Sequence, residues 1–341
     1  MPSDLPTISI IIPTLNAGET LGLCLESVRA QDYPLDRIEI IIGDGGSTDD
    51  TLEVARHHGV DRVVRNPLRT GEAGKSVAAE TARNEVLAFI DSDNILDRPD
   101  WIRRMVAPFA DPDIVACEPL EYTYRVGDTL ITRYCALMGM NDPLCYFIGN
   151  YDRVNRISCR WTEMSIQVED RGEYLKVTLN ERHLPTIGAN GFLVRREAFL
   201  DTIYKPYLFD IDVLYDLVRA GHSRVAKVKI GIVHLFAGDS RSFARKQGRR
   251  VKDFLHYRKL KIRRYPWGGV PRLCLLKFVA STVLVIPLLI QAARGMARTF
   301  DRAWLFHVNA CWLTLAIYGW VFMKDLVFRQ TGVADRAGWR Q

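Results

Sequence analysis

This sequence has no closely spaced cysteine pair and little net charge, and we expect no leader peptide at its start. Its seven cysteines include no C-x-x-C pair, which indicates neither a zinc site nor a disulfide framework and favours reduced thiols in a cytoplasmic setting. The segment Met1–Thr7 is polar and contains proline, unlike a signal peptide. Because the net charge is only +6 over 341 residues, the chain is not generally basic, and we expect no nucleic-acid partner.

Basic residues are concentrated instead in one segment, Arg241–Arg272, while the first hundred residues are mixed or acidic. Within it, Val251–Tyr265 places Phe254 and Leu255 among many lysines and arginines, just before an apolar run. This pattern indicates contact with anionic lipid at a membrane interface. A solvated charged helix is the alternative.

Two long apolar runs follow. Leu273–Ile290 has 18 residues with one charge, Lys277, and Ala303–Met323 has 21 residues with none. As helices they would extend roughly 27 and 32 Å, close to the hydrocarbon thickness of a bilayer. We therefore expect two membrane helices. The connecting segment is basic, so a hairpin that enters the bilayer without crossing it stays open, as does a buried hairpin in a soluble protein.

The first hundred residues alternate between short apolar runs and segments with helical spacing. This alternation predicts a doubly wound, mostly parallel α/β sheet. The expected strands are Ile8–Ile12, Ile38–Ile42, Val63–Val64 and Leu87–Ile90. Further along the chain, helix Asp210–Ala220 and strand Lys227–Val233 are expected.

The strand at Leu87–Ile90 runs directly into Asp91-Ser92-Asp93-Asn94. Alternate residues of an extended chain point the same way, so Asp91 and Asp93 should share a face. Two carboxylates this close need a cation between them, and oxygen ligands suit Mg²⁺ or Mn²⁺. The carboxyl end of such a strand is also where ligands bind in open α/β sheets. The alternative is that Asp93 and Asn94 only turn the chain.

Three motifs together resemble the nucleotide-sugar half of family 2 glycosyltransferases, which are inverting enzymes of the GT-A fold. They are Ile11–Asn16, Gly43–Thr51 and Asp91–Asp93. The order and spacing of the three make the resemblance specific, and it covers about residues 7–235. It implies a donor site for a nucleotide-diphosphate sugar at Pro13, Thr14, Asn16, Asp44, Lys75 and Asp91. It also implies that Asp93 is the direct metal ligand.

The same resemblance implies a catalytic base. Asp210 matches the Asp of a Glu-Asp pair that is typical of the family. The match is partial, because Phe209 stands in the place of the Glu. An inverting transfer needs one carboxylate to take the proton of the acceptor hydroxyl while a metal stabilises the leaving diphosphate. Asp212 is the fallback base, and a helix N-cap is the alternative role for Asp210.

Other matches are partial. His234 ends a strand and could complete the metal shell, with a structural role as the alternative. Gln247–Arg250 resembles the family's Q-x-x-R-W motif but lacks the Trp, so it is either a diphosphate-binding lid or the start of the basic membrane surface. The implied acceptor-side or lid residues are Gly188, Asn190, Asp212, Gln247, Arg249 and Arg250.

The sequence thus predicts a membrane-attached, metal-dependent glycosyltransferase that uses a lipid-linked glycan acceptor in cell-surface glycan biosynthesis. A polyprenyl-phosphate acceptor, a nucleotidyltransferase and a non-catalytic membrane scaffold are the alternatives. We expect a cytoplasmic catalytic domain attached to the inner or plasma membrane, with a homo-oligomer possible. The expected boundaries are 1–240 for the GT-A domain, 241–268 for the interface segment, 269–325 for the membrane helices and 326–341 for the tail.

Overall fold

The computed structural model describes residues 5–266 and 271–328. The chain forms two compact units that do not follow each other simply in sequence. The first unit contains Met1–Thr123 and Met164–Leu235, and the second contains Tyr124–Glu163 and Phe236–Gln341. An excursion of about forty residues from the middle of the chain therefore belongs with the C-terminal helices.

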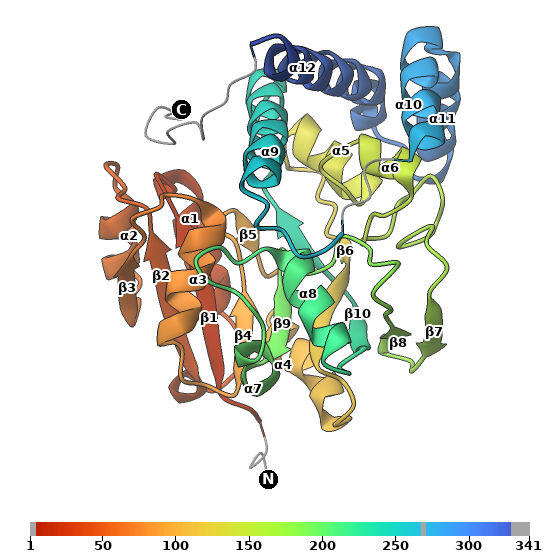
Figure 1. Cartoon of the computed structure of the whole chain (residues 1–341). Helices are drawn as coiled ribbons and strands as arrows, with labels where there is room; N and C mark the ends of the chain where they lie inside the picture. Colours follow the sequence, from red (N-terminus) through yellow and green to blue (C-terminus); the bar gives the residue numbers. More distant parts are fainter. Residues whose placement is uncertain (1–4, 267–270, 329–341) are drawn as a thin grey trace. The chain divides into compact units, whose positions relative to one another are not determined.

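The first unit is built on one sheet whose strand order is β3-β2-β1-β4-β9-β6-β10-β8-β7, with β5 paired to β10 (Figure 1). Its strands are β1 (Ile8–Thr14), β2 (Ile38–Asp44), β3 (Arg62–Arg65), β4 (Val86–Phe89), β5 (Asn94–Ile95), β6 (Ala116–Tyr122), β7 (Gln167–Asp170), β8 (Tyr174–Thr178), β9 (Phe192–Arg195) and β10 (Arg224–His234). The N-terminal strands β1, β2 and β4 are buried along almost their whole length, as expected where both faces of a sheet are covered.

The sheet is mixed, which corrects the expectation of a mostly parallel one. Strands β3, β2, β1 and β4 are parallel as expected. Strand β9, however, inserts antiparallel between β4 and β6. At the far edge, β8 pairs antiparallel with β10, and β7 pairs antiparallel with β8. The error has a physical cause, because the side-chain alternation of a strand is the same in either chain direction.

Helices of the first unit are α1 (Gly18–Arg29), α2 (Thr51–His57), α3 (Gly71–Thr81), α4 (Trp101–Val106), α7 (Arg196–Leu200) and α8 (Asp210–Arg219), with 3₁₀ turns η1 (Leu35–Arg37) and η2 (Ala107–Ala110). Helix α3 lies against β1 and β2 (Figure 1). Two glycines permit this close approach, because a Cβ on Gly43 would lie 2.2 Å from the carbonyl oxygen of Gly74. The contact fixes the next residue of α3, Lys75, beside the strand ends.

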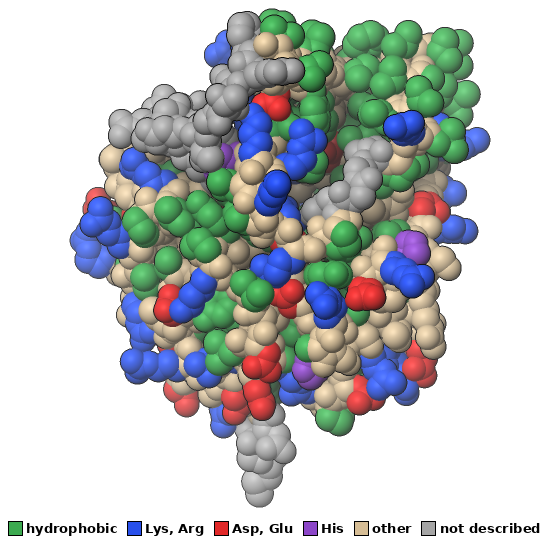
Figure 2. All heavy atoms as spheres, in the orientation of Figure 1, with side chains coloured by type: hydrophobic (Ala, Val, Ile, Leu, Met, Phe, Trp, Pro, Cys, Tyr) green, Lys and Arg blue, Asp and Glu red, His purple; other side chains and the backbone are tan. Residues whose placement is uncertain are grey.

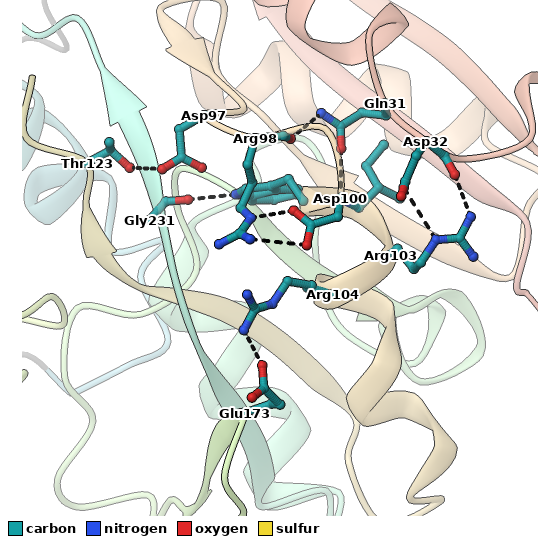
Figure 3. A network of polar contacts seen from close by, with 12 residues as sticks. Gln31, Asp32, Asp97, Arg98, Asp100, Arg103, Arg104, Thr123, Glu173 and Gly231 are labelled. Atoms are coloured by element: carbon teal, nitrogen blue, oxygen red, sulfur yellow. Dashed lines mark hydrogen bonds and ion pairs between the residues drawn. The ribbon is translucent and has the colours of Figure 1, made fainter.

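The segment that follows Asp93 is fastened by side chains around the start of α4 (Figure 3). Gln31 donates to the carbonyl of Arg98 and accepts the backbone N–H of Ile102. The indole of Trp101 is fully buried and donates to the carbonyl of Gly231 at 2.7 Å. Because Gly231 belongs to β10, these bonds tie the chain after Asp93 to the strand that ends at His234.

The second unit is helical. It contains α5 (Leu130–Met138), α6 (Leu144–Ile148), α9 (Ser240–Leu260), α10 (Arg272–Leu284), α11 (Ile286–Arg298), η3 (Arg302–Leu305) and α12 (Phe306–Phe328). Tyr134, Phe243 and Trp304 lie in its main core, which joins α5, α9, η3 and α12. A smaller core around Phe278 joins α6, α10, α11 and α12.

The first of the two expected membrane helices is not one straight helix. Helices α10 and α11 meet at an angle of 90°, where Val285 has a φ of +63° and Pro287 lies in the first turn of α11. Proline cannot donate the backbone hydrogen bond that would continue α10. Each half has 13 residues and so extends about 20 Å, too short to cross a bilayer alone.

The 3₁₀ turn η3 and helix α12 together meet the length and composition of a membrane span over Arg302–Val327. Only 28% of its most apolar window is buried inside the protein. If the bent pair counts as one span, the described residues contain two. Residues 329–341, most of the predicted tail, lie outside the described residues, as do 267–270 at the boundary between the predicted interface segment and the predicted membrane helices.

Candidate active site

The donor residues expected from the first two motifs lie together at the ends of β1 and β2. Thr14 and Asp44 are opposite each other in the parallel register, and the Thr14 hydroxyl donates to the Asp44 carboxylate at 2.9 Å. Asn16 has a φ of +50°. Its side-chain oxygen accepts the backbone N–H of Thr48, and its own backbone N–H donates to the hydroxyl oxygen of Ser47. Pro13 pairs with Gly43 in the same register. The two loops thus form one structure.

Asp44 is held in a fixed orientation. Besides Thr14, its oxygens accept the Ser47 hydroxyl at 2.6 Å and the backbone N–H groups of Gly46 and Ser47 at 2.8 and 3.0 Å. Burial disfavours the ionised carboxylate, but these hydrogen bonds outweigh it and lower the pKa of Asp44 below its ordinary value. Asp44 is therefore an ionised acceptor at neutral pH.

The turn after β4 is closed on itself and attached to β10. The backbone N–H of Asp91 donates to the Asn94 side chain at 3.0 Å, and Asn94 pairs with His234 through β5 and β10. The N–H of Leu235 donates to the carbonyl of Asp93 at 2.9 Å. These bonds bring the Nε2 atom of His234 to 3.5 Å from an oxygen of Asp93. The structure thus brings together two of the three expected metal ligands.

Lys75 connects the third expected ligand to the expected base. Its ammonium lies 3.4 Å from Asp91 and 3.3 Å from Asp210, and its side chain is only 8% exposed. Burial disfavours the charged ammonium, but Asp210 and Asp91 outweigh it and raise the pKa of Lys75 above its ordinary value. A permanent cation therefore lies between two carboxylates that would otherwise repel each other.

Asp210 begins α8, and the N-cap position belongs to Phe209. The interpretation of Asp210 as the cap is therefore wrong. Burial raises the pKa of Asp210 to about 6, against the opposing effect of Lys75. A carboxylate poised near neutrality, with its side chain still 30% exposed, has the properties of a general base. Asp212, the fallback, is fully buried.

Gly188 packs directly against Asp210. It has a φ of +123°, and a Cβ there would lie 2.7 Å from the Cβ of Asp210. Its backbone N–H donates to Glu118 at 3.0 Å, and Glu118 forms a fully buried ion pair of 2.6 Å with Lys227. Sequence reasoning missed this pair, although a charged residue inside each of two apolar strands was the available signal. Glu118 and Lys227 lie opposite each other in the β6–β10 register.

Gln247 and Arg250 lie in a polar network of the second unit. Gln247 is fully buried, donates to the carbonyl of Asn141 at 2.6 Å and accepts from Arg250 and from the Tyr318 hydroxyl. Tyr318 also donates to Asp142 at 2.6 Å. These contacts give Gln247 a structural role between α9 and α12. Its predicted role in a lid, together with exposed Arg249 and with Arg250, stays a prediction.

The side chains at this turn supply only part of the ligand set of a hard divalent cation. Among residues 5–266 and 271–328, no group of three or more His, Cys, Asp or Glu side chains is arranged to hold a metal ion. Mg²⁺ and its relatives are usually bound by one or two carboxylates plus water and substrate phosphates. Asp93 and His234, with Asp91 beside them, fit that incomplete donor set.

Comparison with known proteins gives the same family as the motifs. Residues 9–167 match the model of the family "Glycosyl transferase family 2". Glycosyltransferase AglE of Haloferax volcanii is 31% identical over 147 residues, which cover 41% of this chain and 48% of AglE. A PGL/p-HBAD biosynthesis glycosyltransferase of Mycobacterium bovis is 32% identical over 138 residues, covering 37% of this chain and 48% of that protein. The match thus spans about half the length of these relatives.

Among solved structures, the chain is similar to the mannosyltransferase PcManGT from Pyrobaculum calidifontis, determined in complex with GDP-Man and Mn²⁺. The TM-score is 0.53 at 16% identity, and the match covers 96% of this chain and 89% of that one. At this identity the likeness shows the fold, and it confirms the expected GT-A fold. The match over residues 9–167, just under half of the chain, shows that this part is similar to glycosyl transferase family 2.

Proposed function

We propose that the chain is an inverting, divalent-metal-dependent glycosyltransferase whose donor is a nucleotide-diphosphate sugar. The observation that carries the proposal is the arrangement at one edge of the sheet. Asp93 lies beside His234, while Lys75 joins Asp91 to Asp210. PcManGT, which has the same fold, was determined with GDP-Man and Mn²⁺, a ligand pair of the proposed class.

In this proposal Asp93, Asp91 and His234 hold Mg²⁺ or Mn²⁺. The bound ion would neutralise charge on the leaving diphosphate. Asp210 accepts the proton of the acceptor hydroxyl, and Lys75 keeps its carboxylate in place. The loops that carry Pro13, Thr14, Asn16 and Asp44 bind the nucleoside, with Asp44 as an acceptor for its hydroxyl or N–H groups. Gly188 and Asn190 belong to the acceptor side.

We further propose that the acceptor is a lipid-linked glycan at a membrane. Supporting this, α12 has the length and composition of a span and is mostly exposed, and apolar side chains cover the described surface of α10 and α11 (Figure 2). Exposed apolar surface of this extent is unusual for a soluble protein. The membrane would be the inner or plasma membrane, with the first unit in the cytoplasm. The three sequence-based boundaries, at 240, 268 and 325, stay predictions.

A binding screen tests the donor. The purified full chain in detergent would be heated with UDP, GDP and TDP sugars, each with and without Mn²⁺. One nucleotide sugar should raise the melting temperature only when Mn²⁺ is present, since a ligand that binds the native state stabilises it. Failure of every donor to stabilise the chain would contradict the proposal.

Product analysis then tests the reaction class. A glycosyltransferase that uses this donor releases the nucleoside diphosphate. Release of pyrophosphate would instead identify a nucleotidyltransferase and overturn the proposal.

A further inference from the structure

A chain of buried amides connects the turn at Asp91 to the end of β6. The backbone N–H of Asp91 donates to Oδ1 of Asn94 at 3.0 Å. Nδ2 of Asn94 donates to Oδ1 of Asn190 at 3.0 Å, and Nδ2 of Asn190 donates to the hydroxyl of Tyr122 at 3.0 Å. Asn94 is fully buried, and Asn190 and Tyr122 are 7% and 6% exposed. Three segments distant in sequence are thus joined by consecutive bonds.

The bonds run in one direction. A backbone N–H can only donate, so the Asp91 amide requires the oxygen of Asn94 to face it. This leaves the Asn94 amino group to face Asn190, whose oxygen must accept, and whose amino group must then donate to Tyr122. Neither amide can flip without opposing two donors or two acceptors in a buried site, which is costly. This series of hydrogen bonds therefore has only one arrangement of its donors and acceptors.

Further contacts connect Tyr122 back to the turn at Asp91 through the two expected metal ligands. The ring of Tyr122 lies against the imidazole of His234, with centroids 5.5 Å apart. The imidazole lies 3.5 Å from the Asp93 carboxylate, two residues from Asp91. Asn94, Asn190, Tyr122, His234 and the turn thus form a closed circuit of contacts. A shift at any member displaces Asp93 relative to His234.

We propose that Asn94, Asn190 and Tyr122 are positioning residues that set the separation and orientation of Asp93 and His234 as metal ligands. The inference rests on the proposed function, because it assumes a divalent cation at these two side chains. Asn190 then acts behind the metal site and not only on the acceptor side. Its φ of +53° is a conformation that non-glycine residues seldom adopt, so the backbone is held in an uncommon state that aims the amide into the circuit.

The test measures metal binding directly, with Tyr122→Phe as the main variant. This change removes one hydroxyl and keeps the ring that contacts His234. Tyr33→Phe is the matched control, because the hydroxyl of the buried Tyr33 also donates a hydrogen bond, to the carbonyl of Pro6, and this bond is not part of the circuit. Asn190→Gly is the second variant, since glycine accepts the positive φ and the change removes the side chain that carries the amide. Each full-length protein is titrated with Mn²⁺ in the presence of UDP or GDP by calorimetry.

We expect Tyr122→Phe and Asn190→Gly to bind Mn²⁺ about tenfold more weakly than the wild type, as is typical when a residue behind a metal ligand is altered. Tyr33→Phe should bind as the wild type does. With an active donor, the Mn²⁺ concentration for half-maximal rate should rise by the same factor in both variants, and in Tyr122→Phe kcat at saturating Mn²⁺ should stay within about twofold. Unchanged Mn²⁺ affinity in both variants would overturn the inference. If the wild type itself bound neither nucleotide with Mn²⁺, the proposed function would fail, and this inference with it.

Discussion

Each unit of the chain contains side chains in surroundings that are unfavourable in water, and the examples differ between the two units. In the first unit, charges are buried in pairs, as in Glu118–Lys227, where both side chains are fully buried. In the second unit, large apolar side chains are exposed, including Leu284 and Ile286 at 64% and 65% and Phe300 at 85%. Each arrangement is unfavourable in water, and each therefore indicates that the region has a function.

The comparison separates the chemistry from the attachment. A buried charge is tolerated only with a partner, and clusters of such charges are typical of functional sites. An exposed apolar surface is stable only against a nonpolar environment. The first unit thus has the features of a reaction site and the second those of a contact surface, which we propose is with a membrane. The following predictions test that division.

The largest effect is expected from Asp210→Asn. Loss of a general base lowers the rate by about 10²–10⁴-fold, so kcat should fall by this factor with a hydroxyl acceptor, while recovery of the chain in membranes is unchanged. Asp201→Asn, at an exposed position of the same unit, is the control. Only a mild loss in steady-state assays would favour a polyprenyl-phosphate acceptor, because a phosphate oxygen is already ionised.

A charge in the middle of α12 should weaken attachment of the protein to the membrane and leave its catalytic activity unchanged. Ala316 is exposed and lies near the centre of the apolar segment Arg302–Val327. Ala316→Arg should weaken membrane insertion by about 2.5–3.5 kcal/mol, whereas Ala316→Leu should not. Extraction of membranes at alkaline pH measures the difference. Equal retention of the two variants would show that α12 does not cross the bilayer.

The pH dependence should follow Asp210. Because burial raises its pKa to about 6 and a base acts in its ionised form, kcat/KM should fall about tenfold per pH unit below pH 6. Above pH 6 this group should impose no further dependence. A pH–rate profile on the wild type checks this, and the residual activity of Asp210→Asn should lack the acidic limb. A limb that persists in the variant would assign it to another group.

The smallest effects are expected on α9. Arg245 and Lys252 are exposed on this helix, and each basic residue near an anionic surface contributes about 1 kcal/mol. Changing both to Gln should weaken binding to vesicles containing anionic lipid by roughly 30-fold at low salt and leave binding to neutral vesicles unaltered. Sedimentation with vesicles of the two compositions measures this. Equal loss on both would contradict an electrostatic contact.

Much of the first unit could be predicted because local patterns determine it. The apolar runs of β1, β2 and β4 identify the strands, and the residues directly after them form the donor loops and the Asp91–Asp93 turn. Their clustering follows from parallel pairing, which places the carboxyl ends of strands at one edge. Residue positions that depend on chain order and spacing could therefore be predicted from the sequence.

Contacts between segments distant in the sequence could not be predicted from it. The antiparallel insertion of β9 leaves no trace in the alternation of its side chains, and the link from Asn94 to Asn190 joins residues 96 apart. The membership of Tyr124–Glu163 in the second unit depends on core packing and not on local period. The break at Val285 was signalled by Pro287, but the length of the apolar run concealed it.

The central claim is that a divalent ion held at Asp93 binds the diphosphate of an activated sugar, and calorimetry of the full chain with Mn²⁺ and the stabilising nucleotide sugar tests it most directly. Asp36→Ala, at an exposed site in η1, is the control and should bind as the wild type does. For Asp93→Ala we predict that Mn²⁺-dependent donor binding falls by about a hundredfold or more, since a bound metal contributes several kcal/mol at such a site. Donor affinity and turnover equal to the wild type in Asp93→Ala would contradict the claim.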